Sequence, residues 1–118
     1  MPPGKRELAR IERRLIATLT DACETAKGEI KGFTWLTHII DLNALVETLK
    51  VIWVFETLAD KKLAQVNAKT RIFELTAIAL NEANIDLSLS DINVRFDSEE
   101  ECQRTHGGDW QKRLAKGY

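Results

Sequence analysis

The side chains best suited to chemistry lie near the end of the chain, where Cys102, His106 and Asp109 are close in sequence. Because Cys102 and His106 are four residues apart, on a helix they would point the same way and could bind a metal or form a thiol–imidazole pair. Structural zinc usually needs four Cys or His ligands, and the other two in this chain, Cys23 and His38, are distant in sequence. The glutamates directly before Cys102 also disfavour the thiolate that a nucleophile requires. The sequence therefore predicts neither a metal site nor a catalytic cysteine.

The run His106, Gly107, Gly108, Asp109 and Trp110 has two interpretations. As a structural turn, its glycines adopt positive φ, Asp109 caps a last helical turn and Trp110 anchors the tail on the body of the protein. As a binding pocket, His106 and Trp110 stay exposed around a hollow. A His-Gly-Gly sequence also occurs in esterase oxyanion holes, but the chain has no Gly-x-Ser-x-Gly nucleophile elbow. The turn is the better interpretation, and the pocket stays open as the alternative.

Other motifs of catalysis and cofactor binding do not occur in the sequence. It contains no Walker A loop, no dinucleotide fingerprint and no His-Glu-x-x-His motif. The carboxylates of Glu99, Glu100 and Glu101 follow Ser98 and suit the start of a helix better than acid–base chemistry. We therefore expect a protein that is not an enzyme, with no catalytic residue, no cofactor and no cofactor-binding residue.

The bulk composition indicates one folded domain spanning residues 1–118, with residues 1–5 frayed. Hydrophobic residues make up 44% of the chain and charged residues 30%, a balance that favours folding over disorder. No apolar run approaches the roughly 20 residues that span a bilayer, and the N-terminus lacks the apolar core of a secretory signal. With only two cysteines, a reducing cytoplasm is the simpler setting, and no membrane partner is expected.

The formal net charge of −1 gives no overall attraction for nucleic acid, but the charges are unevenly distributed. Basic residues concentrate in the first helical turns, at Arg6, Arg10, Arg13 and Arg14. These four residues are the candidate contacts to phosphate groups of RNA or DNA. Solvated charges that only keep the protein soluble are the plainer alternative.

Hydrophobic periodicity predicts an α+β fold with a three-stranded, mainly antiparallel sheet packed by two long helices. The expected element order is α-β-β-α-β-α, which is close to a KH-like order, although the Gly-x-x-Gly clamp of KH domains is lacking. The expected elements are a helix with an apolar stripe over 8–26, strands over 33–40 and 49–55, a helix over 58–83, a strand over 91–97, and short helices capped by Ser98 and Asp109.

Two details of these elements bear on function. Strict alternation places Phe33 and Trp35 on one face of their strand, and these aromatics, with Trp53 and Phe55, are expected in the core rather than in a base-stacking platform. In the 58–83 helix, a main stripe beginning at Leu63 and Val66 is widened by further apolar residues. So wide an arc over so few strands suggests a homodimer.

Two stretches, GFTWLTH at residues 32–38 and HGGDW at residues 106–110, resemble motifs of a small family of uncharacterised bacterial proteins of about this length. Its members are sometimes named Fis-type transcriptional regulators. The resemblance spans most of the chain and implies membership only, since no activity is attached to the motifs. A Fis-type protein is all-helical with a C-terminal helix-turn-helix, whereas 33–55 and 91–97 are predicted here as strands.

Taken together, these patterns predict a non-catalytic cytoplasmic interaction or regulatory module, self-associating as a homodimer or binding an unknown protein partner. The alternative is an RNA- or DNA-associated accessory factor that uses the basic N-terminal helix.

Overall fold

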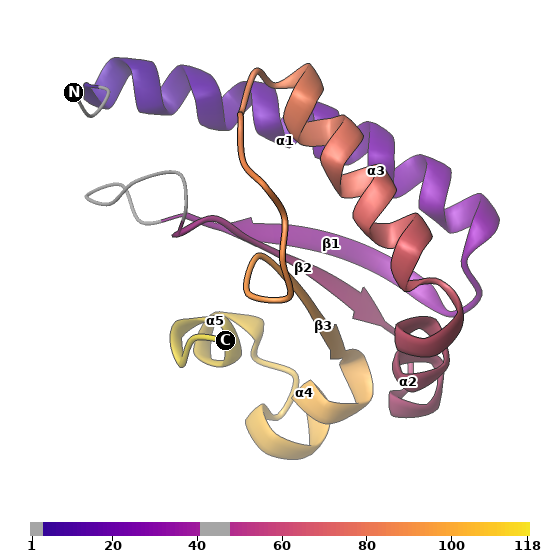
Figure 1. The fold of residues 1–118 in the computed structure, drawn as a ribbon. Coiled ribbons are helices and arrows are strands. Elements are labelled where there is room, and N and C mark those ends of the chain that lie inside the picture. Colours follow the sequence, from indigo (N-terminus) through magenta and orange to yellow (C-terminus); the bar gives the residue numbers. More distant parts are fainter. Residues whose placement is uncertain (1–3, 41–47) are drawn as a thin grey trace.

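The computed structural model describes residues 4–40 and 48–118, and Figure 1 shows how their elements are arranged. The elements, in chain order, are α1 (Lys5–Glu29), β1 (Phe33–Ile39), β2 (Lys50–Phe55), α2 (Leu58–Asn67), α3 (Lys69–Glu82), β3 (Val94–Ser98), α4 (Glu99–His106) and α5 (Trp110–Ala115).

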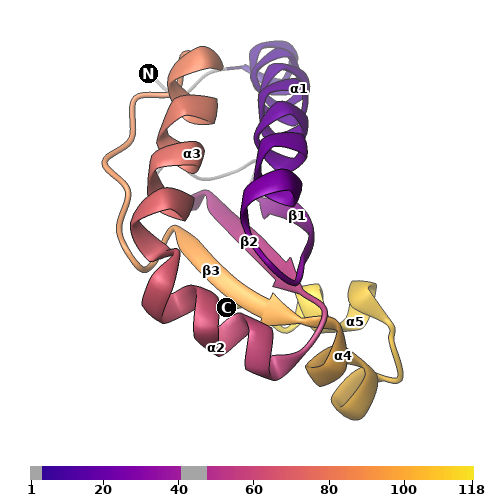
Figure 2. The ribbon, with the colours of Figure 1, turned by 90° about the vertical axis from the view of Figure 1, so that its right-hand side faces the viewer.

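The strands form one three-stranded sheet in the order β1-β2-β3. Strands β1 and β2 pair antiparallel, whereas β2 and β3 pair parallel because the chain crosses back through α2 and α3 between them. Helices α1 and α3 lie side by side on one face of the sheet, and α4 and α5 lie on the other (Figures 1 and 2). The predicted α+β class and the α-β-β-α-β-α order are confirmed, with a sheet that is mixed.

Helix α1 buries one stripe of residues at steps of three and four, including Leu8, Leu15 and Leu19. It runs through Gly28 to Glu29, and the reversal into β1 takes place at Gly32, where φ is +79°. A Cβ atom at Gly32 would lie 2.4 Å from the carboxyl carbon of Asp60. Glycine is therefore required at the start of the GFTWLTH stretch by conformation and by space.

The region 58–83 is not one continuous helix, because it is interrupted at Ala68. The predicted main stripe is also wrong at its start, where Leu63 and Val66 are 51% and 80% exposed. Leu80 at the end of the stripe does reach the core, together with Ile72 and Leu75, which were expected only to widen the stripe. The wide apolar arc thus arises from two helices with different buried faces, and three of its large apolar residues, Leu63, Val66 and Ile78, are exposed.

Strand β1 contains an irregularity that changes which side chains share a face. Phe33 is opposite Phe55, but the register shifts before Trp35, which is opposite Val54. Phe33 therefore packs on Trp53 with ring centroids 4.9 Å apart, while Trp35 points to the α4–α5 side. The prediction that Phe33 and Trp35 share one core face is wrong, because the extra residue at the bulge reverses the alternation.

Strand β2 is buried on both faces, as expected for a central strand. Val51, Trp53 and Phe55 face α1 and α3, and the indole Nε1 of Trp53 donates to Thr76 Oγ1 at 3.2 Å. Ile52 and Val54 are fully buried on the opposite face. Among the described helices, none has both the length and the apolar character needed to cross a membrane.

Candidate interaction surface along β1

The two motif stretches meet in space through a single carboxylate. Trp35, from GFTWLTH, donates its Nε1–H to Glu99 Oε1 at 2.6 Å, and Trp110, from HGGDW, donates to Glu99 Oε2 at 2.9 Å. The two indole rings are also in edge-to-face contact, with centroids 5.0 Å apart. This aromatic pair ties β1 to α5 across the first turn of α4, and both indoles remain partly exposed.

The HGGDW stretch is a turn between α4 and α5. Gly107 and Gly108 have φ of +60° and +84°, and the Asp109 side chain accepts from the backbone N–H of Lys112. His106 ends α4, and its Nδ1 lies 2.7 Å from Thr105 Oγ1. The structure thus places Trp110 against the body of the protein, in contact with Trp35 and Glu99, and His106 at the turn.

Behind this turn, the carboxylate of Asp97 is almost completely buried and holds an ionic cluster. Arg113 donates to both of its oxygens, at 2.6 and 2.8 Å, while the Tyr118 hydroxyl and the Ser98 backbone N–H donate to the same carboxylate. Burial raises the pKa of Asp97, but these donors outweigh burial and hold the pKa below its ordinary value. Hydrogen bonding to Asp97 likewise raises the pKa of Arg113. The cluster fastens the C-terminal segment to the sheet.

The spacing of Cys102 and His106 does not produce a reactive pair. Cys102 is fully buried, and burial raises the pKa of its thiol, which disfavours the thiolate. Among the described residues, no group of three or more His, Cys, Asp or Glu side chains is placed to hold a metal ion.

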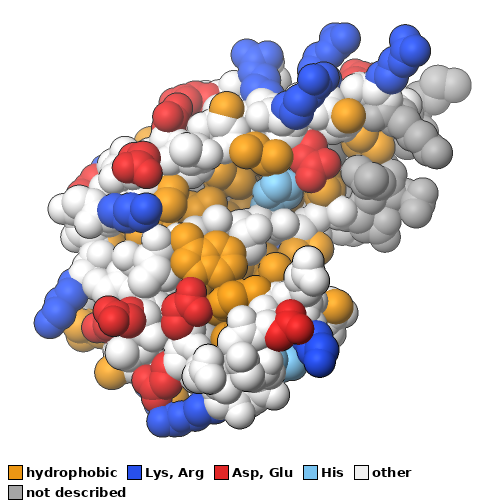
Figure 3. Space-filling model, turned by 180° about the vertical axis from the view of Figure 1, so that it is seen from behind, with side chains coloured by type: hydrophobic (Ala, Val, Ile, Leu, Met, Phe, Trp, Pro, Cys, Tyr) orange, Lys and Arg blue, Asp and Glu red, His pale blue; other side chains and the backbone are white. Residues whose placement is uncertain are grey.

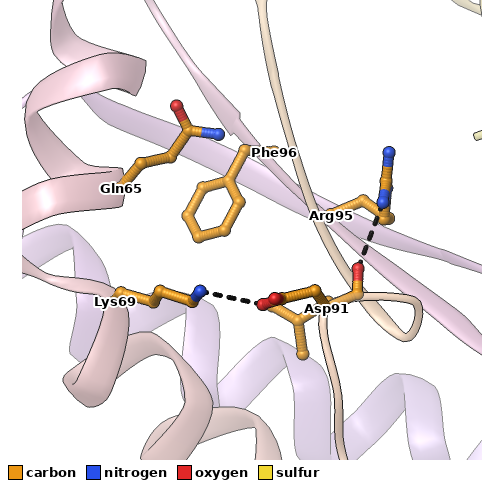
Figure 4. A pocket seen from close by; sticks show the side chains of 6 residues that line it. Gln65, Lys69, Asp91, Arg95 and Phe96 are labelled. Atoms are coloured by element: carbon orange, nitrogen blue, oxygen red, sulfur yellow. Dashed lines mark hydrogen bonds and ion pairs between the residues drawn. The ribbon is translucent and has the colours of Figure 1, made fainter.

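A hollow between α2, α3 and β3 is lined by several polar side chains (Figure 4). Lys69 and Asp91 form an ion pair across it at 2.9 Å, and Arg95 donates to the backbone carbonyl of Asp91. The side chains of Phe96 and Gln65 line the same hollow. The charged side chains that line this hollow therefore already bind each other or the protein backbone.

Strand β1 is an edge strand of the sheet, and no described strand pairs with its outer side. The N–H of Val51 donates to Asn93 on the β3 side at 2.7 Å, and the N–H of Glu56 donates to Gly32 on the β1 side. Backbone groups alternate along a strand, so Ile52 also points toward β1, where its partner is Thr37. It follows that Leu36 and His38 direct their backbone N–H and C=O groups away from the sheet.

A groove runs between this edge and the flank of α1. It is lined on the helix by Ile16, Leu19, Thr20, Cys23 and Glu24, and on the strand by Leu36, Thr37 and His38. Ile16 is 49% exposed although it is a large apolar side chain. His38 Nε2 lies 3.1 Å from Glu12 Oε1 at one end of the groove. Figure 3, seen from the side of α1 and β1, shows hydrophobic side chains gathered in a band between α1 and the α4–α5 layer.

The candidate nucleic-acid residues Arg6, Arg10, Arg13 and Arg14 are all exposed on α1. Their spacing puts them on the face opposite the buried Leu8–Leu15–Leu19 stripe. No acidic side chain of the described residues lies within ion-pair distance of any of the four. They are not brought together with the HGGDW turn.

Some features of this surface were missed at the sequence level. Glu99 was interpreted as a helix-capping carboxylate, yet it joins two tryptophans that are 75 residues apart in sequence. The exposed edge of β1 was not identified at all. Its signal was present, since a three-stranded sheet always has two edge strands and β1 has an apolar residue on each face. No family model, curated protein or solved structure matches the chain.

Proposed function

We propose that the protein is a non-catalytic cytoplasmic interaction module that uses the edge of β1 as its binding surface. One observation carries the proposal: the outward backbone groups of Leu36 and His38 lie between the apolar groove on α1 and the Trp35–Trp110 pair. An incoming strand would gain main-chain hydrogen bonds from the edge and side-chain contacts on both of its faces. An open, apolar edge of this kind favours pairing with another chain.

The chemistry of the polar groups supports a non-catalytic role. The most buried carboxylate, Asp97, is held by Arg113, and the buried thiol of Cys102 is kept protonated at neutral pH. Both are used for structure. We also infer membership of the bacterial family that shares the GFTWLTH and HGGDW motifs. The contact between Trp35 and Trp110 gives a physical reason for the two motifs to occur together.

A photo-crosslinking residue placed in the edge tests this proposal in cells that produce the protein. Thr37, on the β1 edge, is replaced by a photoreactive amino acid, and Lys62, exposed on α2, is replaced in a matched control. We expect a crosslinked adduct from position 37 and none from position 62. Equal labelling of the two positions, or no adduct at position 37, would contradict the proposal.

The second candidate function is binding of RNA or DNA through α1. It is favoured by four exposed arginines on one helix face with no acidic partner among the described residues. Affinity should then fall steeply with salt, because phosphate contacts release counterions. A titration at roughly 50 mM salt against duplex and single strands tests this candidate. Replacing Arg10, Arg13 and Arg14 with Ala should weaken binding, whereas Lys62→Ala should not. Absence of binding at low salt eliminates the candidate.

A further inference from the structure

We propose that the segment occupying the β1 edge is β1 of a second copy of this chain, paired antiparallel about a two-fold axis at Thr37. This inference rests on the proposed function, because it requires the edge to be the binding surface. The second copy is favoured over an unrelated strand because the edge and the neighbouring flank of α1 are each complementary to themselves in this one arrangement.

In this register, the outward backbone groups of β1 in one copy can form hydrogen bonds with those of β1 in the other copy. Leu36 and His38 both direct their backbone groups outward, so a two-fold axis at Thr37 pairs Leu36 of one copy with His38 of the other. Thr37 then faces Thr37, and Trp35 faces Ile39. Thr–Thr pairs and pairs of an aromatic with a β-branched residue are both favourable across antiparallel strands. All of these side chains are partly exposed in the single chain.

The flank of α1 is complementary to itself when two copies run antiparallel. Arg13 and Glu24 are separated by 11 residues, close to three helical turns, and therefore lie on one face with Ile16 and Thr20 between them. Ile16, Thr20 and Glu24 line the groove beside Thr37, so the axis that passes through Thr37 also passes near the middle of this flank. Arg13 of each copy would then be opposite Glu24 of the other.

The charged residues of this flank are available for such contacts. Arg13 has no acidic partner among the described residues, and Glu24 makes only a 3.9 Å contact with Lys27, with both side chains well exposed. Helix α1 packs chiefly on α3 and less on β1, and its residues Arg13, Ile16, Thr20 and Glu24 are exposed in the described part of the chain. An isologous arrangement uses each contact twice, so a small patch is doubled in the dimer.

Engineered cysteines test the strand register. The variant Thr37→Cys in a Cys23→Ala background should form a covalent dimer under mild oxidation, because side chains in a non-hydrogen-bonded antiparallel pair are close enough to be bridged. The control Lys62→Cys in the same background should stay monomeric on a non-reducing gel. A solution dimer in which position 37 does not crosslink, or crosslinks no better than position 62, would overturn this arrangement.

A charge exchange tests the helix contact without disturbing the core. Arg13→Glu should weaken dimerisation roughly tenfold in sedimentation, because two attractive contacts become repulsive. Glu24→Arg should do the same, and the double variant Arg13→Glu with Glu24→Arg should recover most of the affinity. Unchanged dissociation constants for the single variants, or a double variant weaker than either, would overturn the antiparallel helix contact.

Two experimental outcomes distinguish failure of the second-copy inference from failure of the proposed function. If the purified protein is monomeric across the micromolar range while position 37 crosslinks to a different protein in cells, the second copy is overturned and the interaction surface stands. If position 37 crosslinks to nothing and the protein stays monomeric, both are overturned.

Discussion

The two faces of the sheet are closed by different kinds of interaction. On the α1–α3 face, Trp53 and its neighbours are packed almost entirely by apolar side chains. On the α4–α5 face, the buried Asp97–Arg113 pair and the bridging carboxylate of Glu99 provide the main long-range contacts. Both layers end at β1, whose outer edge has no paired strand within the described residues. Apolar packing therefore holds the α1–α3 face, whereas a few directional polar contacts fasten α4 and α5 over the buried Ile52 and Val54.

The largest effect should come from the apolar face. Trp53 is fully buried and hydrogen bonded to Thr76. Trp53→Ala should reduce the free energy of unfolding by about 4 kcal/mol, through lost burial and the cavity left behind. Urea unfolding followed by circular dichroism measures this loss. A smaller loss of stability than that of the Trp110→Ala variant would contradict the claim that apolar packing on the α1–α3 face contributes most to stability.

The next largest effect should come from the ion pair on the opposite face. Arg113→Ala should reduce the free energy of unfolding by about 3 kcal/mol, because the buried carboxylate of Asp97 loses its cation. The double variant Asp97→Val with Arg113→Leu is the control, and it should recover part of the stability by removing the uncompensated charge. A double variant less stable than Arg113→Ala would show that packing, not charge, dominates this face.

Low pH should weaken the ion pair on the α4–α5 face more than the apolar packing on the α1–α3 face. The pKa of Asp97 is lowered in the folded protein. The stabilisation that ionised Asp97 gives the folded state is therefore present above the unfolded pKa of about 3.9 and is lost as pH falls through the folded pKa. Stability should therefore decline below about pH 4, and Arg113→Ala should flatten that decline. Urea titrations at a series of pH values measure the slope. Parallel curves for the two proteins would mean that other carboxylates carry the acid dependence.

A smaller effect is expected at the HGGDW turn. Trp110 is partly exposed, so Trp110→Ala should reduce the free energy of unfolding by about 2 kcal/mol. His106→Ala should change it by no more than about 0.5 kcal/mol, since the turn depends on the glycines and on the Asp109 cap. Thermal melts of both variants distinguish the turn from a pocket. Two unchanged melting curves would favour the pocket.

The difference between the faces also explains what the sequence could predict. The stripe of α1, the strand over 49–55 and the caps at Ser98 and Asp109 follow from local patterns and are confirmed. The bulge after Phe33 was not predicted, because one inserted residue reverses the faces of a strand without changing its composition. The break between α2 and α3 at Ala68 was not predicted either.

The contacts of the polar face depend on pairing between distant residues. Nothing near Asp97 in sequence identifies Arg113 as its partner, and nothing near Trp35 identifies Glu99. The candidate surface was therefore predictable only in part. Its two motifs stood out as unusual runs of residues, but their meeting in space required the fold.

Hydrogen exchange at individual backbone amides of β1 tests the central claim most directly. Thr37 and Ile39 bond to β2 and should exchange slowly at every protein concentration. Leu36 and His38 face outward, so their amides should exchange rapidly in dilute protein and become protected as concentration rises and the edge is covered. Rapid exchange of Leu36 and His38 over the whole concentration range, with Thr37 and Ile39 still protected, would contradict self-association through the β1 edge.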